Sequence, residues 1–263
     1  MASWYVAVIL GIVEGLTEFL PISSTGHLIL AGHILGHTGP KAETFDIVIQ
    51  LGAILAVVVL YWERFWGLLK TDPNRRFSGP YGIYLLILTS IPASVVGLLT
   101  HDYIKEYLFS PFTVACALAV GAIMIFIVEG KEKKETITSL DEVTPLLAFG
   151  IGCFQCLALW PGFSRSAATI MGGMLLGARR TVAAEYSFIA AVPIMFAATG
   201  YDFLKSYHLF ESGDLIFLAI GFIVSFFSAW LAIKAFIILL GKLTLRPFAV
   251  YRLALVPLIF LFL

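Results

Sequence analysis

The chain has 263 residues, of which 60% are hydrophobic and 13% are charged, and its mean hydropathy is +0.95. A soluble domain of this length cannot bury so much apolar surface, so the composition indicates a protein that lies in lipid. The formal net charge is zero, and nothing in the charge pattern suggests a nucleic-acid partner.

The first apolar region, residues 4–36, is interrupted near its middle by the polar run Pro21-Ile-Ser-Ser-Thr-Gly. Neither half is long enough to cross the ~30 Å hydrocarbon core as a helix. The region therefore predicts a broken-helix hairpin that enters and leaves the membrane on one side. Three longer apolar stretches follow, at residues 45–62, 81–99 and 111–128.

The second half of the chain repeats this order. Residues 146–177 are apolar and are broken at Pro161-Gly-Phe-Ser-Arg-Ser, and three apolar stretches follow at 186–201, 215–240 and 247–263. We therefore predict one all-α polytopic membrane domain over residues 1–263. It contains six transmembrane helices and two re-entrant broken-helix hairpins.

Weak internal similarity supports a duplication. Leu20-Pro21 and Ser24 align with Trp160-Pro161 and Ser164 at an offset of 140 (161 − 21), and "PFTV" at 111 recurs as "PFAV" at 247. Each half has one hairpin and three spans, and because three is odd the second half must have the opposite orientation. This is an inverted-topology repeat, with repeats at about 1–130 and 146–263 and a cytoplasmic linker at 131–145. Sites in such folds lie near the midplane, where broken helices meet.

Charge placement gives the orientation. The predicted connections at 63–80, 129–145, 178–184 and 241–246 share one side, and basic residues concentrate there. The eleven basic residues of that side are Arg64, Lys70, Arg75, Arg76, Lys131, Lys133, Lys134, Arg179, Arg180, Lys242 and Arg246, against Lys41, Lys105 and Lys205 opposite. By the positive-inside rule the first side is cytoplasmic, so both termini and the mouth of the first hairpin face outward.

Two glutamates lie just before the first break. Glu14 and Glu18 are one helical turn apart, so both carboxylates project from one face and repel each other. A charge at the bilayer centre costs about 2.5–3.5 kcal/mol on insertion scales, so both are candidates for function. A divalent cation or a bound proton would relieve the repulsion. The structural alternative is a glutamate that caps a helix or reaches the interface.

Polar residues continue beyond the first proline. Ser23, Ser24, Thr25 and Gly26 suit a turn whose backbone N–H groups open the next helix, which is an anion-binding arrangement. Simple N-capping is compatible with this role. His27 is the histidine beside the break, and two carboxylates and several hydroxyls nearby favour a chemical role over an interior structural one.

The second break contributes a cation and more hydroxyls: Ser164, Arg165, Ser166 and Thr169. The planar guanidinium of Arg165 matches two phosphate oxygens at once, so it is a candidate oxyanion clamp. A structural ion pair between Arg165 and Glu14 or Glu18 is the alternative.

Three further residues are weaker candidates. Gln50 could bond between helices or reach the site, and Glu185 lies at the start of a span. Both are assigned at most a supporting position around the site. Arg252 lies in the last span, where a side chain that extends to the interface explains it as well as a functional role does.

Together these groups match phosphate-ester chemistry, with carboxylates, a nucleophile and positive charge on the phosphate oxygens. They also match anion binding for transport. The residues alone do not separate the two.

The motifs resemble a known family. "EGLTEFLPISSTGH" at 14–27 and "PGFSRSAAT" at 161–169 are similar to the two signature motifs of bacterial undecaprenyl-diphosphate phosphatases of the bacitracin-resistance type. The similarity extends through residues 45–59, 152–166 and 183–193, and so covers nearly the whole chain.

This resemblance implies hydrolysis of undecaprenyl diphosphate to the monophosphate, which recycles the lipid carrier of peptidoglycan synthesis and confers bacitracin resistance. It implies dependence on Mg²⁺ or Ca²⁺ and a site on the outer, periplasmic side of the bacterial plasma membrane. By motif, Glu14 and Glu18 match the acidic pair, Ser23, Ser24, Thr25 and His27 match the adjoining segment, and the second motif matches a phosphate-binding part. A homodimer is compatible with this interpretation.

The nucleophile is left open between Ser24, His27 and a water that His27 activates. The rival function is an inverted-repeat transporter or flippase for an anionic or phosphorylated lipid, because this architecture also serves transport. A purely structural membrane protein is the least favoured, because it does not need ionisable groups at both breaks.

Overall fold

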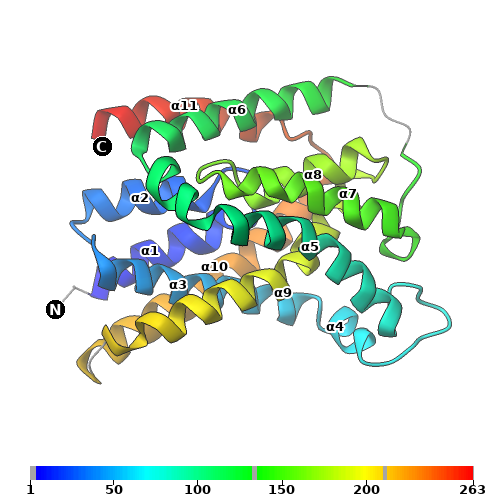
Figure 1. Cartoon of the computed structure of the whole chain (residues 1–263), viewed down its shortest axis with the longest axis horizontal. Coiled ribbons are helices and arrows are strands. Elements are labelled where there is room, and N and C mark those ends of the chain that lie inside the picture. The colour runs from blue at the N-terminus through cyan, green and yellow to red at the C-terminus, as the bar shows by residue number, and fades with distance from the viewer. Residues whose placement is uncertain (1–3, 132–134, 210–211, 263) are drawn as a thin grey trace.

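In the computed structural model, which describes residues 4–131, 135–209 and 212–262, the chain is a helical bundle (Figure 1). Those residues contain no β-strand, only isolated bridges, so the predicted all-α class is confirmed. The α-helices are α1 (Trp4–Thr17), α2 (Ser24–Ile34), α3 (Pro40–Leu60), α4 (Trp62–Leu68), α5 (Gly79–Tyr103), α6 (Pro111–Gly130), α7 (Pro145–Gln155), α8 (Arg165–Leu175), α9 (Arg180–Ser206), α10 (Leu215–Leu240) and α11 (Arg246–Phe262).

Among the described residues, five helices are long and apolar enough to cross a membrane: α3, α5, α6, α9 and α10. They correspond to five of the six predicted spans and make the protein polytopic. The sixth, α11, has 17 described residues, which is at the lower limit of the roughly 17–25 that a span needs. Its crossing of the bilayer therefore stays a prediction.

The helix ends differ from the predicted ones where charges lie at the membrane surface. The first long helix begins at Pro40 rather than at residue 45, because Gly39 and Pro40 start it and the helix carries Lys41 and Glu43 in its first turn. The predicted stretch contained apolar residues only, so it left out these two charged residues, which belong to the helix.

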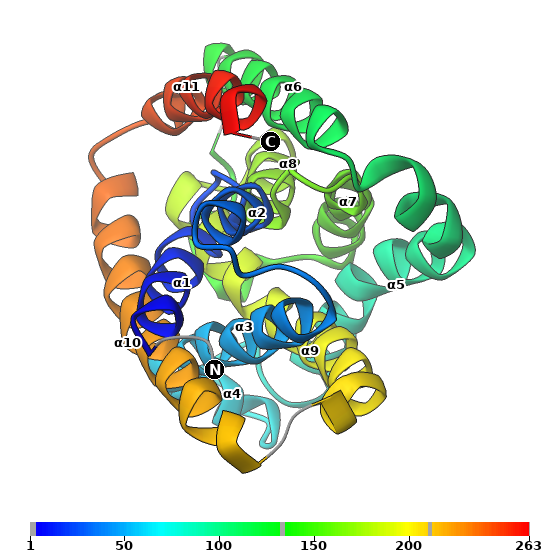
Figure 2. The ribbon, with the colours of Figure 1, turned by 90° about the vertical axis from the view of Figure 1, so that its left-hand side faces the viewer.

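Both broken regions fold as predicted. α1 has 14 residues and α2 has 11, joined by a turn, and α7 and α8 have 11 each, joined by the 3₁₀ turn Cys156–Leu159 and the residues before Arg165. At 1.5 Å per residue each is about 16–21 Å long, too short to span. The two hairpins enter from opposite ends of the molecule and their turns meet inside it (Figure 1), and α2 and α8 lie near the centre (Figure 2).

Close helix packing fixes the first hairpin. A Cβ added at Gly11 would lie 2.8 Å from the Gly221 carbonyl oxygen of α10, and one at Gly15 would lie 2.5 Å from the Ser225 carbonyl oxygen. Two glycines four residues apart thus form a face that lets the backbones of α1 and α10 approach. This contact positions the end of α1, where Glu14 and Glu18 lie.

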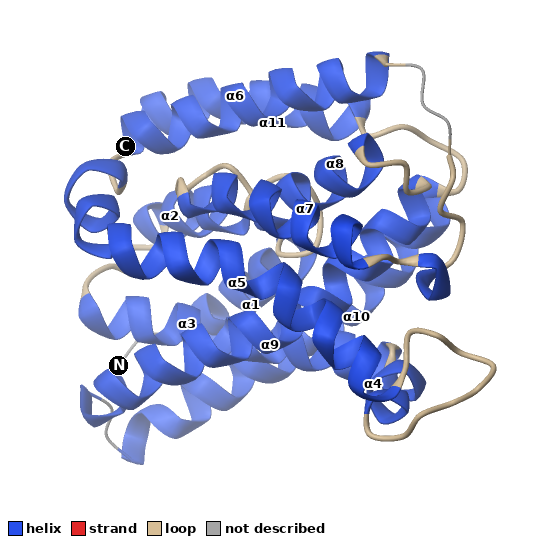
Figure 3. Cartoon of the chain, turned by 45° about the vertical axis from the view of Figure 1, so that its right-hand side comes forward, coloured by secondary structure: helices blue, strands red, loops and turns tan. Residues whose placement is uncertain are grey.

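The connections after α3, α6, α8 and α10 lie toward one end of the bundle, and both termini lie toward the other (Figures 1 and 3). The basic connections therefore share one side as predicted, although Lys133 and Lys134 lie outside the described residues and the side chain of Lys105 is not described. The short helix α4, with exposed Trp62 and Trp66, was not predicted within the first connection. The repeat boundaries at 130 and 146 stay a prediction.

Candidate active site

Two serines with unusual backbone conformation build the two turns. Ser23 has φ 70° and Ser164 has φ 78°, and they are the non-glycine residues with positive φ in the described part of the chain. Each caps the helix that follows: Ser23 Oγ accepts from Gly26 N at 3.4 Å, and Ser164 Oγ accepts from Ala167 N at 3.2 Å. Such conformations cost energy and concentrate at functional sites.

This shared geometry corrects the register of the repeat. Ser23, not Ser24, is the counterpart of Ser164, because each is the N-cap of its helix. The cap follows the proline by two residues in the first turn and by three in the second, so an alignment on Pro21 and Pro161 is one residue out of step at the caps. Ser24 is therefore the first residue of its helix, as Arg165 is the first residue of the corresponding helix in the other half.

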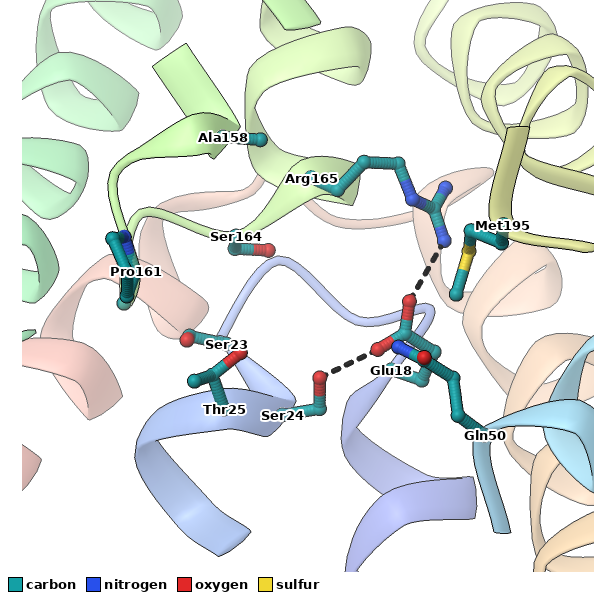
Figure 4. A pocket seen from close by; sticks show the side chains of 11 residues that line it. Glu18, Ser23, Ser24, Thr25, Gln50, Ala158, Pro161, Ser164, Arg165 and Met195 are labelled. Carbon is teal, nitrogen blue, oxygen red and sulfur yellow. Dashed lines mark hydrogen bonds and ion pairs between the residues drawn. The ribbon is translucent and has the colours of Figure 1, made fainter. Parts of the chain in front are cut away.

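A cavity of about 200 Å³ lies where the two turns face each other (Figure 4). Turn residues of both hairpins line it, together with one residue each of α3 and α9. The lining residues are Glu18, Ser23, Ser24, Thr25, Gln50, Ala158, Pro161, Gly162, Ser164, Arg165 and Met195. The cavity is smaller than the roughly 300–1,000 Å³ of pockets for drug-sized ligands, which suits a headgroup rather than a long chain.

Glu18 joins the two hairpins in this cavity. Its Oε1 accepts from Arg165 Nη2 at 3.1 Å, and its Oε2 accepts from the Ser24 hydroxyl at 2.5 Å. The carboxylate and the guanidinium are largely buried, with 6% and 13% of the side chains exposed. Loss of either partner of such a buried ion pair would leave the other charge uncompensated. The Glu18 carboxylate thus aligns a hydroxyl and a cation from different halves of the chain.

A second group of contacts, from Ser187 of α9, holds the Arg165 guanidinium. Its Nη1 donates to the carbonyl oxygen and to the hydroxyl of Ser187, at 3.3 and 3.4 Å, and that hydroxyl also bonds Thr169 Oγ1 at 2.6 Å. Ser166 is fully buried and donates to the Leu20 carbonyl oxygen at 2.8 Å, which ties the second hairpin to the first turn. Thr169 and Ser166 thus support the site from outside the cavity.

Sequence reasoning missed Ser187. It lies within the segment 183–193 that carries the family resemblance, but nothing in its spacing pointed toward Arg165.

His27 lies beside the cavity but does not line it. Its Nδ1 contacts the Ser23 carbonyl oxygen at 2.7 Å and its Nε2 contacts the Tyr251 hydroxyl at 2.7 Å, and the two rings are stacked at 5.5 Å. Because a carbonyl only accepts, Nδ1 carries the proton and Nε2 accepts from the tyrosine. Both nitrogens are therefore engaged in holding the turn against α11.

Comparison with known proteins places these motifs in a family. The model of the family described as bacitracin resistance protein BacA matches residues 7–258. A protein named undecaprenyl-diphosphatase from Maridesulfovibrio salexigens is 74% identical over 262 residues, which cover 100% of this chain and 99% of the relative. The chain belongs to the BacA family.

Other BacA-family relatives agree in name and length. An undecaprenyl-diphosphatase from Nitratidesulfovibrio vulgaris is 68% identical over 262 residues, covering 100% of this chain and 99% of its own. One from Lawsonia intracellularis is 56% identical over 264 residues, covering 99% of both chains. The predicted family is therefore confirmed.

Two further predicted site residues of this BacA-family chain, Glu14 and Glu185, lie outside the cavity. Glu14 is 1% exposed and does not line the cavity, and neither carboxylate oxygen has a hydrogen-bond partner among the described residues. The charged groups that act on it are Glu18, Asp46 and Arg165. Glu185 lies apart from the cavity, where its charge interacts with Arg64 and Arg179 near the basic connections.

Arg252 does not extend to the membrane interface. Its side chain is 0% exposed, so the interfacial interpretation is wrong. The sequence suggested that interpretation because Arg252 is six residues from the start of α11, close enough to a helix end for a long side chain to reach water.

Proposed function

We propose that this BacA-family protein hydrolyses undecaprenyl diphosphate to undecaprenyl phosphate and inorganic phosphate. The names of its relatives support the substrate, and the observation that carries the proposal is the Glu18 carboxylate held between the Ser24 hydroxyl and the Arg165 guanidinium. In a bacterial plasma membrane this reaction would return the lipid carrier to peptidoglycan synthesis, and the family description links it to bacitracin resistance.

Ser24 is the proposed nucleophile. Glu18 Oε2 is 2.5 Å from its hydroxyl oxygen, within reach to take the proton as general base. The Ser24 oxygen forms a bond to the terminal phosphorus while the bond from that phosphorus to the bridging oxygen breaks. Undecaprenyl phosphate leaves with the bridging oxygen, and a phosphoserine remains.

A water completes the reaction. Glu18, after its proton has passed to the departing phosphate, accepts one from the water that attacks the phosphoserine phosphorus. The bond from phosphorus to the Ser24 oxygen breaks, and that oxygen regains a proton from Glu18. The products are inorganic phosphate and the original hydroxyl, so one water is consumed for each diphosphate.

Arg165 binds the phosphate oxygens. Its Nε is buried and has no hydrogen-bond partner among the described residues, so a donor is free to face an anion. Donors fixed before the reaction stabilise charge as it develops on the transferred phosphoryl group. The hydroxyls of Ser23, Thr25 and Ser164 line the same cavity and add donors.

Of the three nucleophiles that the sequence leaves open, His27 is the least supported. Each of its nitrogens is occupied, one by the Ser23 carbonyl and one by Tyr251. His27 therefore holds the first turn in place. We expect His27→Gln to keep measurable phosphate release, whereas Ser24→Ala should lower the rate of release about 10³-fold or more. Incubation with substrate ³²P-labelled in its terminal phosphate and acid quenching should leave label on Ser24, and label on His27 would overturn this assignment.

A divalent cation, Mg²⁺ or Ca²⁺, fits the acidic pair. Glu14 has two buried carboxylate oxygens without a partner among the described residues, and such oxygens are the ligands that these cations prefer. Glu14 would be its main protein ligand, with Glu18 contributing beside the bonds that its oxygens accept from Ser24 and Arg165, and a bound cation would neutralise phosphate charge. In the described part of the chain no three His, Cys, Asp or Glu side chains gather as a metal site by themselves, so phosphate oxygens would complete the ligands.

Removal of the cation tests this directly. Purified protein treated with EDTA should lose phosphate release and regain it when Mg²⁺ or Ca²⁺ is added in excess. Unchanged release in EDTA would exclude the cation from the reaction.

The lipid tail stays in the bilayer, because the cavity is sized for the diphosphate. With the basic connections in the cytoplasm, the first hairpin opens toward the periplasm, and we place substrate access on that side. A homodimer stays a prediction, and mass measurement of the protein in detergent by light scattering tests it.

The experiment that tests the function is phosphate release from undecaprenyl diphosphate by purified protein in detergent. Cation-dependent release by the wild type and its loss in Ser24→Ala would support the proposal. A folded wild-type protein that releases no phosphate with either cation would contradict it and return the transporter to consideration. The relatives' names do not favour that alternative.

A further inference from the structure

Arg252 is a buried cation outside the proposed chemistry. Its side chain is 0% exposed and ranks among the largest fully buried side chains. Within the described residues no carboxylate lies within ion-pair distance of it. A buried charge without a counter-ion is costly unless hydrogen bonds satisfy it, so its contacts indicate why it is there.

Those contacts are backbone carbonyls of both turns and of α6. Nη1 donates to Pro21 O at 3.3 Å in the first turn, and Nη2 donates to Gly162 O at 3.2 Å in the second. Nε donates to Leu118 O and Nη2 also to Ala117 O, each at 3.1 Å, both in α6. One guanidinium thus ties together two turns that are 141 residues apart in the chain (162 − 21).

The packing around Arg252 leaves the guanidinium little freedom. A Cβ added at Gly121 of α6 would lie 2.1 Å from Nη2, so the absence of a side chain there makes room for the group. The neighbouring residue, Tyr251, holds His27 on the first hairpin. One turn of α11 therefore fixes the first hairpin at two points and the second at one.

We propose that Arg252 is a positioning residue that sets the placement of the two turns, and so of Ser24 relative to Arg165. This inference rests on the proposed phosphatase activity. The two turn carbonyls that bind Arg252 belong to Pro21 and Gly162, each two residues before a capping serine, so a shift of the guanidinium moves the reacting groups of both hairpins. Transition-state geometry is more sensitive to such shifts than substrate binding is.

Substitution by lysine separates geometry from charge. Arg252→Lys keeps the positive charge but offers donors at one point only, so it cannot reach acceptors in three elements. We expect kcat to fall about 10- to 100-fold with KM changed less than about threefold. Gly121→Ala, which keeps the arginine but displaces Nη2, should lower kcat in the same way.

Two variants serve as matched controls. Gly130→Ala lies on the same helix as Gly121 and its added Cβ meets nothing within 4 Å. Arg246→Gln removes an exposed arginine from the same helix as Arg252. Both should keep wild-type kcat.

Hydrogen exchange read by mass spectrometry gives a measurement that does not depend on activity. In Arg252→Lys, exchange should rise in the turn segments 18–24 and 160–165 and stay unchanged in α10. A uniform rise over the chain, or wild-type kcat in Arg252→Lys, would overturn the proposal. If Arg252→Lys does not fold, Gly121→Ala decides by the same two measurements. If the wild type releases no phosphate, the function fails while the exchange pattern still tests the positioning.

Discussion

At the scale of single residues, the candidate site depends on pairs from different halves of the chain. Glu18 of the first half bonds Arg165 of the second at 3.1 Å, and Ser187 of α9, within the second half, holds Arg165 in turn. The guanidinium can serve a phosphate only if these contacts hold its plane in place, because a flexible arginine loses its matched geometry.

Removal of one of these contacts should have a graded effect. Ser187→Ala deletes a hydroxyl that bonds both Arg165 and Thr169, so we expect kcat/KM for phosphate release to fall about 3- to 10-fold, equivalent to about 0.7–1.4 kcal/mol. Ser206→Ala on the same helix is the control, because among the described residues that hydroxyl bonds the Asp202 carbonyl of its own helix and nothing near Arg165. Equal activity of both variants would show that Ser187 does not orient Arg165.

The ionisable residues of the site were predictable from the sequence, but their partners were not. Glu18 and Arg165 stand out because a charge within an apolar segment is costly and rare. Ser187 does not stand out, because a serine within a membrane helix is common and its partner is set by helix packing. The role of Arg252 stayed open between two alternatives for a related reason, since only the fold reveals that turn carbonyls surround it.

At the scale of elements, the approach of α1 to α10 positions the acidic pair. Gly11 and Gly15 line the contact, and a methyl group at Gly15 would lie 2.5 Å from the backbone oxygen of Ser225. Backbone atoms cannot yield as a flexible side chain can, so α1 would have to move away from α10.

A substitution at this contact should therefore destabilise the protein and impair the site. Gly15→Ala is expected to lower the free energy of unfolding by about 1–3 kcal/mol, in the range of overpacked cores. Thermal unfolding in detergent measures the change. Gly200→Ala in α9 is the control, since its added Cβ meets nothing within 4 Å. A Tm for Gly15→Ala equal to that of the control would contradict the tight contact.

The hairpins were predictable because proline and glycine interrupt two apolar runs near the middle, and each half that remains is too short to span the membrane. The ends of the long helices were less predictable, because charged residues such as Lys41 and Glu43 belong to the helix but lie beyond the hydrocarbon. The short helix α4 was missed because seven residues give too little periodicity. The alignment of the two halves on Pro21 and Pro161 was one residue out at the capping serines, because the second turn has one more residue between its proline and its cap.

At the scale of the whole molecule, the two hairpins enter from opposite ends and meet inside the bundle (Figure 1). The basic residues in the connections at one end give the orientation in the membrane. We expect the α4–α5 connection in the cytoplasm and the α2–α3 connection outside. In a background with Cys116, Cys153 and Cys156 replaced by alanine, Thr38→Cys should react with an impermeant thiol reagent in intact cells. Asn74→Cys should react only after the membrane is opened. The reverse pattern would invert the topology.

The central claim is that the two turns form one active site, and a double-mutant cycle on phosphate release tests it most directly. Glu18→Gln and Arg165→Lys should each lower kcat/KM about 10²-fold, because each breaks the same interaction across the turns. The double variant should then lose little more than the worse single variant. Losses that multiply to about 10⁴-fold would mean that the two residues act independently, and would contradict a single site built from both hairpins.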